Sequence, residues 1–274
     1  MRRPRLILAI IVAVIALLGY YGMREHNPFT GETQHIGITR DQEVALGLQS
    51  APVMAQEFGG LDEDPELRAL VEEVGNRLAT RSVAVRSGYA FSFHLLRDPQ
   101  TVNAFALPGG PVFITRGLLD RLDHEAQLAG VLGHEVGHVI GRHSAEHIAQ
   151  SQLVQGLVGA VGLAASDEDG RNRAAAAAAA VVGQMVQLRY GRDDELQADT
   201  LGVRLMAEAG YDPRALVDVM RVLAEAGGGR ETPEFMSSHP DPGNRDALIR
   251  SVIEHHWPDG VPAELTMGRP LPRD

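Results

Sequence analysis

The chain has 274 residues, 44% of them hydrophobic and 22% charged, a composition that indicates a globular protein with a sizeable core and excludes disorder. The net charge of −11 excludes a broad basic surface for nucleic-acid phosphates, so no nucleic-acid partner is expected. Cysteine is absent, which rules out disulfides, iron–sulfur clusters and thiolate zinc sites, so any metal must be bound by His, Asp or Glu.

The N-terminal segment combines positive charge with a long apolar run. Arginines at positions 2, 3 and 5 precede an apolar stretch from Leu6 to about Tyr21. Its length lies between that of a signal-peptide core and a full transmembrane helix, and no small-residue cleavage site follows it. We therefore predict an uncleaved, single-pass membrane helix over residues 1–23, with the arginines in the cytoplasm. Removal of the segment as a signal peptide is the alternative.

Three further segments are predicted after this helix. Residues 24–38 contain Pro and Gly and form a tether, residues 39–257 form one folded unit, and residues 258–274 form a C-terminal tail. The folded unit has mostly helical periodicity, one short strand-like region and no internal repeat. The predicted fold class is therefore α+β, mainly helical with a small β-sheet.

The first two helices of this unit have clear start signals. Thr39 is the expected N-cap of the first, and Gln42 three residues later completes a pattern that resembles a capping box. Pro52 is expected to bend or divide this helix, because proline lacks the amide hydrogen. Asp64 and Pro65 provide an N-cap and a first residue for the second helix.

The hydrophobic period then changes to that of strands. Residues 89–96 (YAFSFHLL) and 109–115 (GGPVFIT) are predicted to be short strands, with NAFALPGG between them. From Gly117 to about Gln155 the pattern is helical again. Residues Leu153–Val186 are predicted to form a helical hairpin with close packing and not a membrane span, because each apolar run is short, glycine-interrupted or mostly alanine.

Three more helices are predicted after this hairpin. DDELQADTLGVRLMAEAG ends near Gly210, and the next helix has Asp212 as its cap, Pro213 at its first position and Gly227 past its end. DPGNRDALIRSVIEHH repeats the Asp–Pro start and is predicted to be helical as well.

The segment LAGVLGHEVGHVIGRHSAEH contains the strongest chemical signal. His134 and His138 are four residues apart, so on a helix both imidazoles can reach one Zn²⁺ at roughly 2.0–2.1 Å. Glu135, about 100° round the helix, can reach a water on that ion as the general base of an H-E-x-x-H arrangement. A chance match is disfavoured because the neighbours are apolar or glycine, where buried imidazoles need partners. His143 and His147 fall on other faces and are predicted to be solvent-facing or capping residues.

A catalytic zinc site also needs a third protein ligand and a position open to water. RYGRDDELQADTLG offers Asp193, Asp194, Glu195 and Asp199 as candidates. Glu195 and Asp199 are one helical turn apart, so one can bind the metal while the other orients a ligand imidazole. Enrichment of acids at a helix N-terminus is the simpler explanation for Asp193 and Asp194.

Four segments in this order resemble the motifs of metallopeptidase family forty-eight, a gluzincin family that includes the HtpX, CAAX prenyl and periplasmic LoiP-like proteases. They are NAFALPGGPVFITRGLL, LAGVLGHEVGHVIGRHS, RYGRDDELQAD and SSHPDPGNR. The resemblance implies a zincin-type metallopeptidase domain that binds one Zn²⁺ per chain, with Glu195 as third ligand and Asp199 in support. It also implies that His239 and Arg245 face the metal and help to hold the transition state.

The resemblance further implies a zinc endopeptidase of protein quality control. Glu135 would activate the water, and NAFALPGG would present an edge strand to the backbone of unfolded or damaged envelope proteins. The expected location is the bacterial inner membrane with the catalytic domain in the periplasm, or the soluble periplasm if the signal is cleaved. In some relatives the histidine at the position of His239 also occupies the open metal position in a latent state, which is a hypothesis for this chain.

Two other classes of function stay open at this point. One is a zinc-binding envelope chaperone or adaptor with little proteolysis, and the other is a zinc hydrolase of a non-peptide bond. The intact Glu135 argues against the first, because a structural metal site needs no base beside it.

Overall fold

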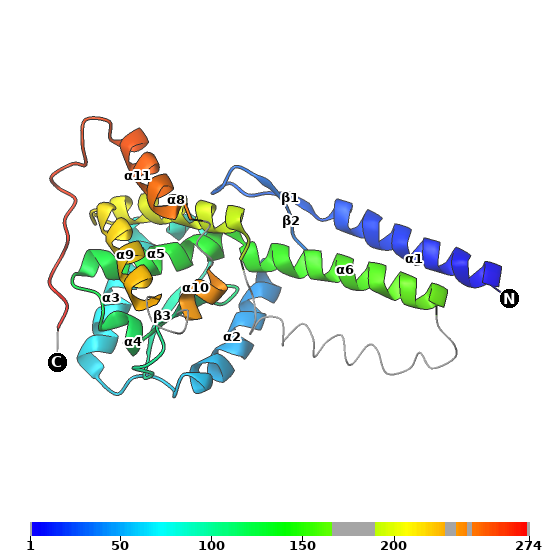
Figure 1. Cartoon of the computed structure of the whole chain (residues 1–274), viewed down its shortest axis with the longest axis horizontal. Helices are drawn as coiled ribbons and strands as arrows, with labels where there is room; N and C mark the ends of the chain where they lie inside the picture. The colour runs from blue at the N-terminus through cyan, green and yellow to red at the C-terminus, as the bar shows by residue number, and fades with distance from the viewer. Residues whose placement is uncertain (1, 166–189, 228–233, 240–242, 273–274) are drawn as a thin grey trace. The chain divides into compact units, whose positions relative to one another are not determined.

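The computed structural model describes residues 2–165, 190–227, 234–239 and 243–272. Two compact units make up the chain. The first unit consists of Met1–Gln42 and Arg142–Leu188, and the second of Glu43–Gly141 and Arg189–Asp274. Each unit therefore contains segments from distant parts of the sequence (Figure 1).

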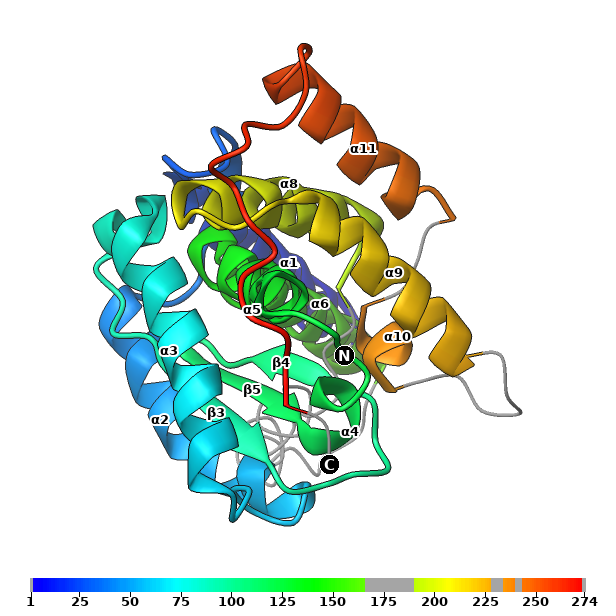
Figure 2. The same ribbon diagram turned by 90° about the vertical axis from the view of Figure 1, so that its left-hand side faces the viewer.

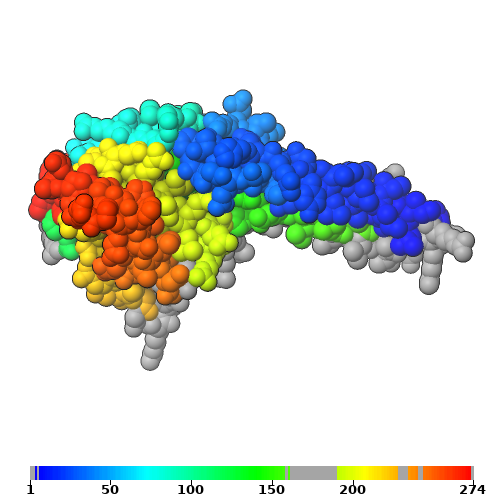
Figure 3. All heavy atoms as spheres, turned by 90° about the horizontal axis from the view of Figure 1, so that it is seen from above, coloured from blue at the N-terminus to red at the C-terminus, as the bar shows by residue number. Residues whose placement is uncertain are grey.

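The first unit is built around two long helices that lie side by side (Figure 1, Figure 3). A short antiparallel hairpin of two strands follows the first of them, within the segment predicted as a tether. Gly156 allows close packing, since a Cβ atom there would lie 2.8 Å from Cβ of Ala16. The elements are α1 (Arg2–Gly22), β1 (Arg24–His26), β2 (Thr33–His35) and α6 (His143–Ala165).

The segment predicted as a membrane helix, residues 1–23, is helical over Arg2–Gly22 but is not confirmed as a membrane span. Within the described parts of the chain, no helix combines the length and the hydropathy that crossing a bilayer requires. The first arm of the predicted hairpin Leu153–Val186 is the end of α6, and residues 166–186 lie outside the described residues.

The second unit confirms the mainly helical α+β prediction. Its three-stranded sheet has the order β3-β5-β4, in which β3 and β5 are parallel and β4 and β5 antiparallel, so β4 lies at an edge. Helix α5 contacts α3, α8, α9 and the sheet, as Figure 2 shows. The strands are β3 (Ser92–Leu96), β4 (Ala104–Ala106) and β5 (Pro111–Thr115).

Most helices of the second unit occur where the sequence patterns predict them. They are α2 (Arg40–Glu57), which begins in the first unit, α3 (Pro65–Arg81), the short 3-10 helix η1 (Val83–Ser87), α4 (Arg116–Leu119), α5 (Glu125–Gly141), α8 (Arg192–Glu208), α9 (Arg214–Gly227), α10 (Glu234–Ser238) and α11 (Arg245–His256). The short helix α10 was not predicted.

The predicted starts of α2 and α3 are confirmed. The Asp–Pro start predicted for the last helix is not, because α11 begins at Arg245 with Asn244 as its N-cap, and the predicted break at Pro52 is wrong. The amide of Thr39 donates to Oε1 of Gln42 at 2.8 Å and the amide of Gln42 donates to Oγ1 of Thr39 at 3.3 Å, which is a capping box. Helix α2 continues through Pro52. The carbonyl left without its amide partner belongs to Leu48, whose side chain is exposed, so water can satisfy it.

Helix α5 is buried along all of its 17 residues. Small residues let α8 approach it closely: a Cβ atom on Gly137 would lie 2.9 Å from the carbonyl oxygen of Ala198, and one on Gly202 would lie 3.3 Å from the amide nitrogen of His134. The backbones of α5 and α8 therefore meet directly, and side chains from the two helices converge at that crossing.

The C-terminal tail caps the N-terminus of α5. The carbonyls of Met267 and Arg269 accept hydrogen bonds from the amides of Ala126 and Glu125, both at 3.0 Å. The first amides of a helix have no partner within it, so the tail acts as its backbone cap. The Arg269 side chain adds ion pairs to Glu125 and Glu73.

Candidate metal centre

The two histidines of the H-E-x-x-H segment lie on one face of α5, as their spacing predicts. His134 and His138 are each 1% exposed, and their Nε2 atoms are 3.0 Å apart. Nδ1 of His134 lies 2.9 Å from Oδ1 of Asp199. When Nδ1 of His134 donates a hydrogen bond to this carboxylate, the ring's lone pair is on Nε2. That atom is on the side of His138, where it can bind a metal.

Helix α8 provides the carboxylate that joins these two imidazoles. Oε2 of Glu195 lies 3.4 Å from Nε2 of His134, and Oε1 lies 3.5 Å from Nε2 of His138. Asp199, one turn later, contacts the far side of the His134 ring. Of the alternatives left open by the sequence, the geometry therefore places Glu195 beside the Nε2 atoms. Asp194 instead accepts the amide of Gly191 at 2.8 Å, at the helix N-terminus.

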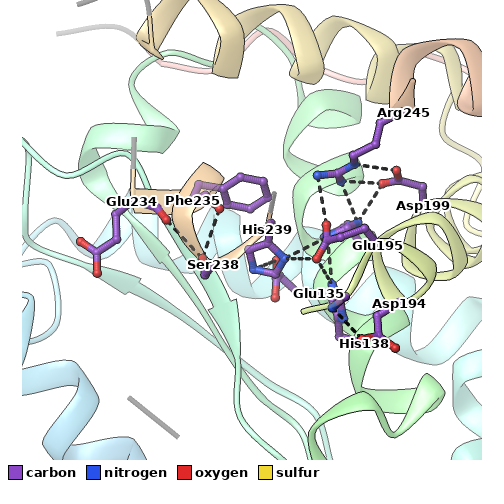
Figure 4. A network of polar contacts seen from close by, with 12 residues as sticks. Glu135, His138, Asp194, Glu195, Asp199, Glu234, Phe235, Ser238, His239 and Arg245 are labelled. Atoms are coloured by element: carbon purple, nitrogen blue, oxygen red, sulfur yellow. Dashed lines mark hydrogen bonds and ion pairs between the residues drawn. The ribbon is translucent and has the colours of Figure 1, made fainter. Parts of the chain in front are cut away.

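His239 completes the cluster from the end of α10. Its Nδ1 lies 3.0 Å from Oε1 of Glu195 and 3.3 Å from Nε2 of His134, as Figure 4 shows for the Glu195 contact. The Phe235 ring stacks on the His239 ring with centroids 4.5 Å apart. Ligand atoms of His134, His138, Glu195 and His239 all lie within 4.8 Å of one another.

The donor atoms of this cluster fit a zinc ion. Two imidazole nitrogens and one carboxylate oxygen form the ligand set of many catalytic zinc sites. Oε2 of Glu195, both carboxylate oxygens of Glu135 and Nε2 of His239 are buried, and none of these atoms has a hydrogen-bond partner among the described residues. Oε2 of Glu195 has an ion-pair partner in Arg245, but three buried carboxylates share that one fixed positive charge, so the arrangement is typical of a cation site.

Arg245 approaches the carboxylates from the first turn of α11. Its Nε donates to Oδ2 of Asp199 at 2.8 Å and its Nη2 donates to Oδ1 at 2.7 Å (Figure 4). Its Nη1 lies 3.1 Å from Oε2 of Glu195. Arg245 is 2% exposed, and these contacts direct its guanidinium at two carboxylates of α8.

Burial and neighbouring charges set the proton affinities of the site. Burial raises the pKa of Glu135, which favours its role as a proton acceptor. Burial opposes a charge on His134, but hydrogen bonds to Asp199 and Glu195 outweigh it and raise the pKa of His134 to about 9. Burial also opposes the charges on Glu195 and Asp199. His239 and His134 nevertheless hold the pKa of Glu195 below its usual value, and Arg245 does the same for Asp199.

The structure brings together the seven predicted site residues: His134, Glu135, His138, Glu195, Asp199, His239 and Arg245. Two aromatic neighbours were missed. The Tyr190 ring stacks on His138 with centroids 3.9 Å apart, and Phe235 stacks on His239. Tyr190 directly precedes the acidic motif, which is a usable signal, whereas nothing in the sequence around Phe235 indicates its position.

The prediction of a solvent-facing His143 is wrong, because His143 is 1% exposed. The angular count assumed one continuous helix from α5 onward. Arg142 has a φ of 57°, so α5 ends at Gly141 and a separate helix, α6, begins at His143. His147 is half-buried, and neither histidine belongs to a group of candidate metal ligands in the part of the chain that the structure describes.

Comparisons with known proteins agree with this site. The sequence profile of Peptidase family M48 matches residues 65–253. The chain is 30% identical over 232 residues to the beta-barrel assembly-enhancing protease of Yersinia pestis, an alignment that covers 80% of this chain and 45% of that protein. It is 30% identical over 246 residues to the mitochondrial metalloendopeptidase OMA1 of Schizosaccharomyces pombe, covering 86% and 67% of the two chains. The protease of Escherichia coli is 32% identical over 203 residues, or 70% and 40%. The chain thus spans less than half the length of two of these three relatives.

Proposed function

Because the chain belongs to Peptidase family M48, we propose that it is a zinc-dependent endopeptidase with His134, His138 and Glu195 as zinc ligands. The observation that supports this most directly is the buried cluster of two imidazoles and a carboxylate beside Glu135, whose oxygens accept no hydrogen bond among the described residues. A bound zinc ion would supply Lewis acidity, which lowers the pKa of a water and polarises the scissile carbonyl.

Glu135 is the proposed general base. Both of its oxygens are buried and accept no hydrogen bond among the described residues, and burial raises its pKa. It lies on α5 next to the ligand His134, so it can accept a proton from the attacking water and then deliver it to the leaving amine. Its neighbour across the site is Nε2 of His239, at 3.6 Å from Oε1.

His239 is the proposed donor to the developing oxyanion. Its Nε2 is buried and has no hydrogen-bond partner in the described part of the chain, so a substrate oxygen can take that position. One such donor is typically worth about 2.7–4 kcal/mol of transition-state stabilisation. The contacts of Arg245 with two carboxylates of α8 favour a different role for that residue.

The same position of His239 also supports a latent state. Its Nδ1 lies close to the ligand atoms of Glu195 and His134. There it can take the coordination position on the metal that the attacking water would otherwise occupy. Replacement of His239 by Ala would then release activity on a flexible peptide. If His239→Ala only lowers activity, with no release from a latent state, the latent state is rejected and the donor role towards the oxyanion remains.

The proposed substrates are unfolded or damaged polypeptides. Strand β4 lies at the edge of its sheet and contacts α5, which carries the catalytic residues. An extended substrate can add to such an edge through main-chain hydrogen bonds, a mode that reads backbone more than side chains. We further propose that residues 1–23 attach the protein to the bacterial inner membrane, with the peptidase in the periplasm. Release of the full-length chain by high salt alone would refute that attachment.

The deciding experiment compares zinc content with cleavage. Purified wild-type protein should contain one zinc per chain and cleave casein, whereas Glu135→Gln should keep the zinc and lose cleavage. Glu254→Gln, which changes an exposed carboxylate on α11, is the matched control and should behave as wild type.

Other outcomes favour the other two classes of function. Zinc binding and suppression of aggregation without any cleavage indicate a chaperone or adaptor. Hydrolysis of small esters or amides with intact casein indicates a hydrolase of non-peptide bonds.

A further inference from the structure

We infer that Arg245 is a positioning residue, which holds the two carboxylates of α8 in the geometry that the metal requires, and is not a donor to the substrate. This inference rests on the proposed zinc peptidase function. It concerns how the ligand set is held in place, which neither the family membership nor the ligand cluster determines.

The guanidinium binds two residues that are one helical turn apart. Nε and Nη2 form a two-pronged contact with Asp199, at 2.8 and 2.7 Å, and Nη1 reaches Oε2 of Glu195 at 3.1 Å. All three nitrogens of the planar group therefore face carboxylates. A lysine ammonium is a point charge and cannot reproduce this geometry.

Through Asp199, Arg245 acts on the first metal ligand. Oδ1 of Asp199 contacts both Nη2 of Arg245 at 2.7 Å and Nδ1 of His134 at 2.9 Å. When Arg245 fixes the Asp199 carboxylate, that carboxylate fixes the ring orientation and the tautomer of His134. The lone pair of His134 Nε2 then stays directed at the metal position.

Through Glu195, Arg245 acts on the third metal ligand. Its contact with Oε2 leaves Oε1 next to His239, at 3.0 Å from Nδ1. Glu195 is fully buried, so the fixed positive charge of Arg245 on one side of its carboxylate determines the orientation of that carboxylate.

The packing of α11 explains how a charged group reaches this depth. Ile249 and Ile253 on α11 are buried, and α11 contacts both α8 and α9. Arg245 is the first residue of this helix, so docking of the helix places its side chain against α8. Because all three of its nitrogens contact carboxylates, the guanidinium is not presented to a substrate.

The test measures zinc affinity separately from turnover, on the full-length protein and with a competing chelator. In Arg245→Met the zinc dissociation constant should rise about 10–100-fold, the typical effect of losing a partner that orients ligands. Arg245→Lys, which keeps the charge, should recover only part of the affinity. Under saturating zinc, kcat should recover substantially towards the wild-type value, because no contact to the substrate is lost.

Two controls make the result specific. Arg250→Met removes an exposed arginine of the same helix, paired with Asp246 at 2.9 Å, and should leave zinc affinity and turnover unchanged. In a double-mutant cycle, Arg245→Met should cost less affinity in an Asp199→Asn background, since both changes disrupt one network. If Arg245→Met fails to fold by circular dichroism, Arg245→Lys and the Asp199→Asn variant carry the same comparison.

Some results would overturn the inference. Zinc affinity within twofold of wild type, together with a fall in kcat that excess zinc does not restore, would make Arg245 a donor to the substrate. Additive effects in the cycle would show that Arg245 does not act through Asp199. A wild-type protein that binds no zinc would instead refute the proposed function itself.

Discussion

Gly137 should tolerate a methyl group less well than Gly130 or Gly133 on the same helix, α5. A Cβ atom there would lie 2.9 Å from the carbonyl oxygen of Ala198 and 3.2 Å from its Cα, which is about 0.5 and 0.2 Å closer than an ordinary contact of 3.4 Å. Both atoms are backbone, so they cannot rotate away. Gly133, one turn earlier and also facing α8, has room, because its nearest neighbour would be the carbonyl oxygen of Gly202 at 3.6 Å.

Comparing the stabilities of Gly133→Ala and Gly137→Ala separates the effect of packing from the effect of helix propensity. Gly133→Ala should stabilise the protein by about 0.5–1 kcal/mol through the lost flexibility of glycine. Gly137→Ala has the same gain but also about 1–3 kcal/mol of overpacking. The propensity gain cancels between the two variants, so the expected difference is about 1–3 kcal/mol, or a gap of about 2–12 °C in Tm for a domain of this size.

The assay is thermal unfolding of metal-free protein, followed by zinc affinity. Ala198 directly precedes Asp199, so the shift that Gly137→Ala forces on α8 should also weaken zinc binding, whereas Gly133→Ala should leave it unchanged. Equal melting temperatures for the two variants would refute the argument that α5 and α8 meet backbone to backbone at Gly137.

Three further predictions concern the surroundings of the site. Truncation after residue 266 removes three backbone hydrogen bonds, two to the carbonyls of Met267 and Arg269 that cap α5 and one from the amide of Leu271 to the carbonyl of Asp123, so urea unfolding should show a loss of about 1.5–4.5 kcal/mol; an unchanged midpoint would contradict the capping role. Tyr190→Phe should keep zinc affinity near wild type and Tyr190→Leu should lower it, because the ring stacked on His138 restrains that ligand; equal affinities would exclude this effect. Chelation should abolish cleavage and lower Tm, and added zinc should restore both, whereas an unaltered Tm would mean that the metal does not bind the folded state preferentially.

The sequence predicts the parts of the site that depend on local spacing. The four-residue interval between His134 and His138 defines a shared helix face wherever that helix lies, and the Asp64–Pro65 start defines a helix without tertiary information. Local spacing alone does not predict whether Glu195 or Asp199 is the metal ligand. Spacing places both on α8 one turn apart, and only the crossing of α8 over α5 brings Glu195 to the Nε2 atoms.

The features that sequence reasoning missed depend on tertiary packing. The angular count for His143 fails because the positive φ of Arg142 ends α5, and arginine gives no signal of that conformation. The continuity of α2 through Pro52 depends on which face of the helix meets solvent. Helix α10 has five residues, too few to show a period, yet it carries Phe235, which stacks on His239 directly after the helix.

The charge balance of the site explains how polar residues can occupy the most enclosed helix of the second unit. Glu135, Glu195 and Asp199 have no exposed surface, and Arg245 adds one positive charge among them. Ionised, these four residues sum to −2, which a divalent cation neutralises. Without that cation the site must bind protons or water instead: burial raises the pKa of Glu135, and the carboxylates of Asp199 and Glu195 outweigh burial and raise the pKa of His134. The same argument explains why Arg245 belongs to the metal site: if that guanidinium were turned towards a substrate, two buried carboxylates would lose their fixed counter-charge.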